Sequence, residues 1–269
     1  YYPLDSWFIK VTEKKNLLIK LNQSINWKPK STGDRRFGNW LSNANDWNLS
    51  RSRFWGIPLP IWRTEDSKET IIIGSIEELK CEITKSISLG FMKVDPFDSF
   101  QVDDMSDLNY DQIDLHKNIV DQIILSSKNK KRMYREPDLI DVWFDSGSMP
   151  YAQWHYPFEN KEMIDDNIAF PADYIAEGVD QTRGWFYTLH AISSMVFESI
   201  SYKNVISNGL VLDKNGQKMS KRLGNVVDPF KTIEKFGPDA TRWYMISNAN
   251  PWDNLKFDIE GIEESKRKF

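Results

Sequence analysis

Cysteine and histidine are scarce in this sequence of 269 residues, which contains one cysteine, Cys81, and three histidines, His116, His155 and His190. A lone cysteine excludes an internal disulfide, and histidines so far apart lack the spacing of zinc ligands, so we expect no zinc site. No apolar run reaches the roughly 18 to 20 residues that a membrane span needs, and neither a signal peptide nor a transit peptide is visible. These absences favour a cytoplasmic protein without a membrane partner.

An excess of basic residues is also missing, because 35 Lys and Arg stand against 39 Asp and Glu, for a net charge of -4. A protein that binds nucleic acid mainly through charge would be basic, so any RNA contact must be local. One short basic run could form such a contact and consists of Lys128, Lys130, Lys131 and Arg132. At this net charge a solvated loop is the favoured interpretation of that run.

The pattern from residue 136 to 250 predicts an α/β fold. A short strand is expected at 172–176, a helix at 182–200 and a second strand at 204–212, followed by a polar turn and two helical stretches broken at Gly237. Strand, helix and strand in this order are typical of a doubly wound parallel sheet of the Rossmann-like kind. Ligands of such sheets bind at the carboxyl ends of the strands.

The sequence before residue 136 has a different composition. Residues 1–63 begin with a predicted strand at 7–11 and a short helix at 14–21, and continue in a turn-rich stretch, 33–62, that is dense in Arg and Trp. Residues 64–135 are rich in Lys, Glu, Asp and Ser. We interpret 64–135 as a small inserted α+β module on the surface of the main domain, with no recognisable chemistry.

A first candidate site is the segment Glu177–Gln181, which the pattern places between the first strand and the following helix. Its glycine, Gly178, would let the backbone approach a ligand, and the helix N-terminus favours an anion. The carboxylates of Glu177 and Asp180 could accept hydrogen bonds from an ammonium group or from ribose hydroxyls. An ordinary helix cap beside a solvated acidic loop explains the same residues equally well.

A second candidate site is the loop Gly216–Gly224, which follows the second strand. Its lysines, Lys218 and Lys221, could neutralise the charge that builds on a leaving pyrophosphate. The loop lacks the spacing of a Walker A motif. The alternative is an exposed basic turn, which would not need Met219 and Ser220 between its lysines.

Several sequence motifs of the chain together resemble those of the class I aminoacyl-tRNA synthetases. Lys218–Arg222 (KMSKR) is similar to the lysine-rich signature loop of that class, with arginine where many members have serine. Residues 46–62 (DWNLSRSRFWGIPLPIW) resemble the segment by which the Ile, Val and Leu subgroup re-enters the catalytic core after the editing insertion. Three further motifs favour the isoleucyl members, with valyl members as the close alternative. These motifs are 141–147 (DVWFDSG), 177–187 (EGVDQTRGWFY) and 208–212 (NGLVL).

The resemblance implies a division of the chain. Residues 1–63 would re-enter the catalytic core, 64–135 would be the surface insert, 136–250 would form the second half of the Rossmann-like catalytic domain, and 251–269 would begin the connection to an anticodon-binding domain. The HIGH-type motif of the family and its editing domain are not in this sequence. We therefore expect a fragment that needs the rest of the synthetase chain for activity.

The resemblance also implies roles for individual residues. Glu177 and Gly178 would hold the aminoacyl-adenylate, Asp180 would face the ribose and Gln181 the aminoacyl part. Lys221 would bind ATP with the support of Lys218, Met219 and Ser220, and the two lysines would be catalytic. Trp143 and Trp185 would enclose the isoleucine side chain, since large rigid apolar faces suit a branched aliphatic group.

The implied reaction is activation of isoleucine by ATP, with Mg²⁺ on the phosphates, followed by transfer to tRNA(Ile). Two alternatives stay open, namely a valine-specific synthetase and a non-catalytic module that only binds adenylate, tRNA or a protein.

Overall fold

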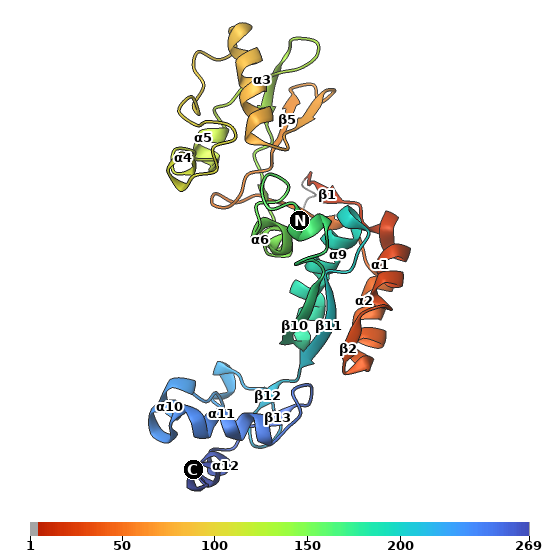
Figure 1. Ribbon diagram of the computed structural model, residues 1–269, viewed down its shortest axis with the longest axis vertical. Coiled ribbons are helices and arrows are strands. Elements are labelled where there is room, and N and C mark those ends of the chain that lie inside the picture. Colours follow the sequence, from red (N-terminus) through yellow and green to blue (C-terminus); the bar gives the residue numbers. More distant parts are fainter. Residues whose placement is uncertain (1–4, 269) are drawn as a thin grey trace. The chain divides into compact units, whose positions relative to one another are not determined.

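The computed structural model, drawn in Figure 1, describes residues 5–268. Its chain divides into two compact units. The first unit contains the residues up to Ile9 together with Asp46–Asp145. The second unit contains Lys10–Asn45 and the chain from Ser146 onward. Each unit is described by itself.

The first unit is built around an antiparallel sheet of four strands in the order β6-β5-β8-β7. The helix α3 packs against this sheet, and its apolar residues Leu79 and Ile83 are spaced for one helix face. The apolar core of this part has buried members that all lie between Trp62 and Met133. The elements are β5 (Ile61–Thr64), β6 (Thr70–Ile72), α3 (Ile76–Ser88), α4 (Asp107–Tyr110), α5 (Lys117–Val120), β7 (Leu125–Ser126) and β8 (Arg132–Arg135).

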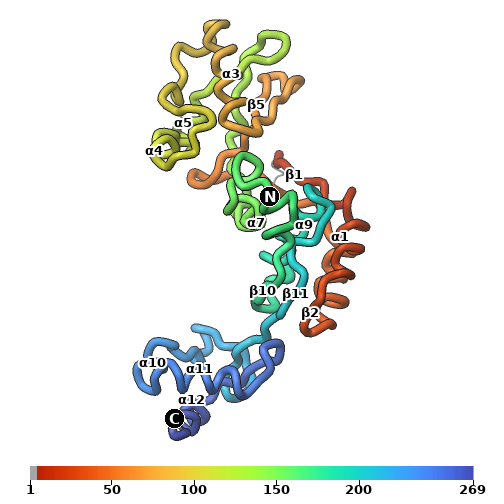
Figure 2. The backbone as a smooth tube through the Cα atoms, in the orientation of Figure 1, coloured from red at the N-terminus to blue at the C-terminus, as the bar shows by residue number. Residues whose placement is uncertain are grey.

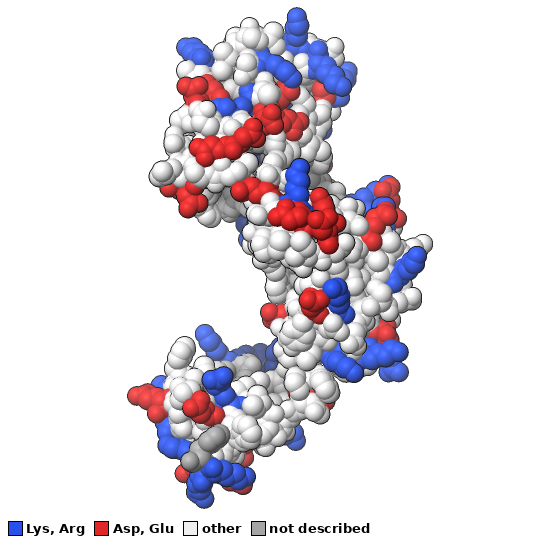
Figure 3. Space-filling view, viewed as in Figure 1, with Lys and Arg blue, Asp and Glu red and all other residues white. Residues whose placement is uncertain are grey.

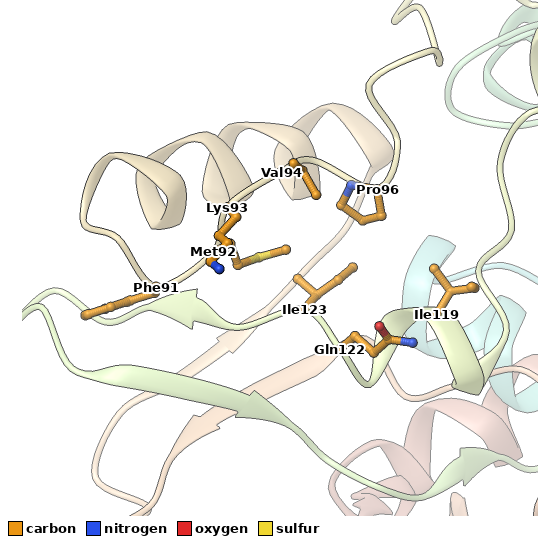
Figure 4. Close-up of a pocket in the computed structure, with 8 residues that line it drawn as sticks. All are labelled: Phe91, Met92, Lys93, Val94, Pro96, Ile119, Gln122 and Ile123. Carbon is orange, nitrogen blue, oxygen red and sulfur yellow. The ribbon is translucent and has the colours of Figure 1, made fainter.

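The connection between α3 and β7 is irregular backbone interrupted by α4 and α5, as Figure 2 shows. A shallow pocket lies where the chain leaves α3 and is lined mainly by apolar side chains (Figure 4). Among the lining residues, Ile123 also belongs to the buried core. The pocket is therefore an open edge of that core, and it contains none of the predicted site residues.

Two short strand pairs complete the first unit. They are formed by β1 (Phe8–Ile9) with β3 (Trp47–Asn48) and by β4 (Ser50–Arg51) with β9 (Leu139–Ile140), and both are antiparallel. The strand expected at 7–11 is thus confirmed for two residues only, because Val11 already begins the 3₁₀-helix Val11–Lys14. Helix α6 (Val142–Gly147) crosses the boundary between the two units.

The second unit contains the predicted parallel sheet, with the strand order β10-β11-β2. Strands β10 (Ala172–Gly178) and β11 (Tyr202–Asn208) are parallel and are joined by α9 (Trp185–Phe197), which runs beside them in Figure 1. Strand β2 (Asn26–Lys28) pairs with the other edge of β11. The α/β fold and the strand-helix-strand order predicted from the sequence are confirmed. The helix expected near 14–21 is also confirmed, as α1 (Lys15–Asn22).

The expectation of a turn-rich stretch from residue 33 is wrong for its first ten residues, because the chain is helical over Thr32–Phe37 and α2 (Gly38–Ser42). Packing explains the difference. A Cβ on Gly33 would lie 2.3 Å from Cδ1 of Trp27, so only glycine fits against that indole. The Asn22 side chain also donates to the Gly33 carbonyl at 3.1 Å, which fixes the start of this helical segment.

The second predicted strand is shorter than 204–212, because β11 ends at Asn208 and Val211–Leu212 forms a separate strand, β12. The backbone N–H of Gly209 donates to the Pro251 carbonyl, and β12 pairs with β13 (Leu255–Lys256). The helices on either side of Gly237 are present, as α10 (Pro229–Phe236) and α11 (Pro238–Ser247). The remaining helices are α7 (Met149–Ala152), α8 (Glu162–Asp165) and α12 (Ile259–Arg267).

His190 makes the core of the second unit sensitive to acid. Its ring is fully buried on α9, and Nε2 donates to the Leu18 carbonyl at 2.9 Å, since a carbonyl can only accept. Burial lowers the pKa of His190 from 6.5 to about 4, although the hydrogen bond to Leu18 acts in the opposite direction. The unfolded chain therefore binds the proton first as the pH falls below 6.5, and stability is lost from there down to about pH 4.

We predict that this group alone removes about 2 kcal/mol of stability between neutral pH and about pH 5. His190→Gln keeps a donor for the Leu18 carbonyl but has no proton to gain in this range. Urea unfolding of the full-length protein at several pH values should show a flatter pH profile for this variant. Parallel profiles for parent and variant would contradict the prediction.

Candidate functional site

The acidic turn, residues 177–181, begins at the carboxyl end of β10. Glu177 and Gly178 are the last residues of that strand and lie opposite Ser207 and Asn208 of β11. The Glu177 side chain is half-buried and has no hydrogen-bond or ion-pair partner among residues 5–268. A Cβ on Gly178 would lie 2.5 Å from Oδ1 of Asp180, so a larger residue there would displace the exposed Asp180 side chain. The strand thus ends in a carboxylate that is available to a ligand.

Gln181 holds the turn against the next helix. Its Oε1 accepts from the backbone N–H of Trp185 at 2.9 Å, and its Nε2 donates to Oδ2 of Asp180 at 3.2 Å. The first amide of α9, which has no partner within the helix, is satisfied in this way. Both ends of the Gln181 amide are therefore engaged inside the turn.

Two residues outside the predicted site, Thr182 and Arg36, form hydrogen bonds that stabilise the turn. Thr182 is fully buried in the 3₁₀-helix Val179–Arg183, and its hydroxyl donates to the Val179 carbonyl at 2.8 Å. The same hydroxyl accepts from Nε of Arg36 at 2.9 Å, across 146 residues of sequence. The sequence does not reveal this pair, since neither residue stands in a pattern that marks it as a partner of the other.

The two tryptophans predicted to enclose isoleucine fall in different units. Trp185, at the start of α9, is half-buried, and its indole N–H donates to the Ser146 carbonyl at 2.8 Å. A Cβ on Gly147 would lie 2.9 Å from Cδ1 of Ile192, so α9 packs closely on this segment. Trp143 belongs to the first unit and has 43% of its surface exposed.

A buried carboxylate holds the backbone beside Trp143. Asp141 is 4% exposed, forms an ion pair with Nη2 of Arg51 at 2.8 Å and accepts from the indole N–H of Trp47 at 2.9 Å. Its own backbone N–H donates to the Leu49 carbonyl. These contacts join the segment 46–53 to the segment that carries Trp143. Two of the motifs, 46–62 and 141–147, are therefore held together by hydrogen bonds and an ion pair.

The lysine loop, residues 218–222, follows β12 in the second unit. Lys218 and Lys221 are exposed, and their ammonium groups have no hydrogen-bond or ion-pair partner in the described part of the chain. Ser220 caps the 3₁₀-helix Lys221–Leu223, because its Oγ accepts from the Leu223 N–H at 3.2 Å. Met219 is half-buried and lines an apolar pocket together with Val211 and Ile233. The loop therefore has an anchored backbone and free charges.

The basic run of the first unit is partly neutralised. Lys131 forms an ion pair with Asp66 at 2.8 Å, and the guanidinium of Arg132 lies 5.2 Å from the centre of the Phe91 ring. The hydrogen bond to Asp66 raises the pKa of Lys131. On the face drawn in Figure 3, basic and acidic side chains are interspersed. These contacts favour a solvated loop at this run.

The described residues contain no group of three or more His, Cys, Asp or Glu side chains that could hold a metal ion. Residues 5–268 also contain no helix that is long and apolar enough to cross a bilayer.

Comparison with known proteins assigns the family. The model of the class I tRNA synthetases (I, L, M and V) matches residues 1–258, so the chain belongs to this family. Within it, the chain is similar over its whole length to isoleucine--tRNA ligases, with 66% identity to that of Bacteroides fragilis, 62% to that of Porphyromonas gingivalis and 46% to that of Thermus thermophilus. The resemblance that the motifs indicated is confirmed.

The chain spans only 24% of the length of each of these relatives. A solved structure supports the fold. It is a LeuRS of Agrobacterium radiobacter K84 in a ternary complex with tRNA and LeuAMS, which aligns with a TM-score of 0.56 and 22% identity. The alignment covers 83% of this chain and 27% of the LeuRS chain.

We predict that Gln181→Ala loosens the start of α9, because the Trp185 N–H loses its acceptor. A lost helix cap costs about 1 kcal/mol, which is about a fivefold loss of protection. Hydrogen exchange of the full-length protein, read in peptides covering 182–190, measures this directly. Gln181→Glu keeps an acceptor and should retain more of the protection. Unchanged exchange in Gln181→Ala would contradict the role of the cap.

Proposed function

We propose that this chain is the part of an isoleucine--tRNA ligase in which isoleucine is activated. The observation that supports this most is the 66% identity, over the whole chain, to a protein of that name. Because the chain spans 24% of that relative, activity belongs to the complete protein and the piece alone is inactive. Its partners are then isoleucine, ATP, tRNA(Ile) and the rest of the synthetase chain.

The acidic turn binds the aminoacyl-adenylate in this proposal. Glu177 supplies an unpaired, half-buried carboxylate that can accept from the ligand, and Gly178 lets the backbone approach it. Asp180 is exposed and faces the ribose hydroxyls. Gln181 completes this group beside the aminoacyl part, with its amide held by Trp185 and Asp180.

The lysine loop binds ATP. An oxygen of the isoleucine carboxylate attacks the α-phosphorus, the bond to the bridging oxygen breaks, and pyrophosphate leaves with the negative charge. Lys218 and Lys221 neutralise this charge in the proposal, which is supported by their exposed ammonium groups without partners among residues 5–268. Ser220 and Met219 fix the backbone that carries them. Positioning and charge stabilisation suffice, and no covalent enzyme intermediate is needed.

Mg²⁺ enters this scheme with its substrate. The described residues offer no cluster of three acidic or histidine side chains, which fits an ion held by the ATP phosphates and water better than one held by a protein cage. When bound there, it withdraws charge from the phosphates. No zinc ion is part of the proposal.

In this proposal Trp143 and Trp185 each contact the side chain of isoleucine. Each indole is partly exposed within its own unit, and the backbone N–H of Trp143 donates to Oδ1 of Asp141 at 3.4 Å. Charged tRNA is consumed by ribosomes, so we place the protein in the cytoplasm.

We predict that the full-length protein catalyses isoleucine-dependent exchange of pyrophosphate into ATP. Lys221→Ala should lower this rate about 100-fold or more, because the charge that stabilises the leaving group is lost. Lys214→Ala is the matched control, since Lys214 is an exposed lysine in the adjoining turn.

Equal rates for Lys221→Ala and Lys214→Ala would contradict the assignment of the loop. Exchange that depends on valine and not on isoleucine would show a valine-specific enzyme. No exchange with any amino acid would leave only the non-catalytic module.

A further inference from the structure

The backbone of the lysine loop is held by one amide side chain that lies after the signature residues. Asn225 Nδ2 donates to Oδ2 of Asp213 at 2.9 Å and to the Lys218 carbonyl at 3.3 Å. Its Oδ1 accepts from the backbone N–H of Ser220 at 2.9 Å. A single half-buried amide thus grips the loop on both sides of Met219.

Asp213 continues this network on the other side. Its Oδ1 accepts from the backbone N–H groups of Asn215 and Gln217, at 2.9 and 2.8 Å. The hydrogen bond from Asn225, and next the one from the Gln217 N–H, lower the pKa of Asp213. The carboxylate is therefore ionised at neutral pH, and it ties the turn 213–217 to the loop that follows.

The contacts of this network end on the backbone and not on the lysine ammonium groups. Turns in polar loops are often closed by Asp or Asn, but such turns usually bond to residues two or three positions away. Here the side chains of Asp213 and Asn225 meet across 12 residues and enclose the whole signature. The backbone is fixed while the charged ends of Lys218 and Lys221 stay exposed.

We propose that Asn225, supported by Asp213, is a positioning residue of the lysine loop and determines where Lys218 and Lys221 meet the polyphosphate of ATP. This inference rests on the proposed function. Asn225 does not touch the substrate in it. It acts through the Lys218 carbonyl and the Ser220 N–H, so its loss should lower the rate of the chemical step without weakening the binding of isoleucine.

The test compares variants of the full-length protein in isoleucine-dependent pyrophosphate exchange. Asn225→Ala should lower kcat about 10-fold to 100-fold, as small misplacements of catalytic groups do. The KM for isoleucine should not change, because the acidic turn has its own hydrogen bonds. The control is Asn215→Ala, which removes a side-chain amide from the turn 213–217. The side chain of Asn215 has no partner among the described residues.

A charge swap tests the pair itself. Asn225→Asp places two carboxylates against each other and removes the donor to the Lys218 carbonyl, so it should be worse than Asn225→Ala. Adding Asp213→Asn supplies an amide that can donate to the new carboxylate at position 225. The double variant Asp213→Asn/Asn225→Asp should therefore recover part of the activity and of the hydrogen-exchange protection over 213–225. Unchanged exchange over 172–190 shows that each variant is folded.

Parent-like kcat in Asn225→Ala and Asn225→Asp, with an inactive Lys221→Ala, would overturn this inference and leave the proposed function intact. A parent-like Lys221→Ala would instead overturn the proposed function of the loop. If the double variant is no better than Asn225→Asp in rate or in protection, Asp213 and Asn225 do not act as a pair and the inference is wrong.

Discussion

The parallel pairing of β10 with β11 determines where both candidate segments begin. Gly178 lies beside Asn208 in this register, so the two strands reach the same edge of the sheet with their carboxyl ends together. The acidic turn leaves the sheet at that edge directly. The chain that leads to the lysine loop leaves the sheet at the same residue pair, after Asn208, and first forms β12. A shift of this register would separate the carboxylate of Glu177 from the strand end that leads to the lysines.

The acidic turn and the lysine loop have the same arrangement, in which an ordered backbone carries charged side chains that have no partner among the described residues. In each, a side-chain amide fixes the backbone: Gln181 bonds to the Trp185 N–H, and Asn225 bonds to the Ser220 N–H and the Lys218 carbonyl. The groups left without partners among the described residues are the charged ones, Glu177 in the turn and the two lysines in the loop. Rigid backbone beneath free charge is what electrostatic stabilisation of a transition state requires, because the charges then need no reorganisation.

Local sequence patterns predicted more of the secondary structure than of the long-range contacts that hold it in place. Alternation and helical spacing were enough for β10, α9 and the parallel sheet, since each pattern is contained in a few consecutive residues. The helix at 32–42 was missed because it depends on the indole of Trp27 against Gly33, and the end of β11 depends on Pro251. The pairs Arg36 with Thr182 and Asp213 with Asn225 are contacts in space, which motif reading does not reveal.

Binding of a non-hydrolysable isoleucyl-adenylate analogue to the full-length protein, followed by hydrogen exchange, tests the central claim most directly. We expect slower exchange in peptides covering 177–185 and 213–225 and no change in the inserted module, residues 64–135. The valyl analogue should slow exchange less. Protection confined to other segments, or equal protection by both analogues, would contradict an isoleucine-activating site built from these two segments.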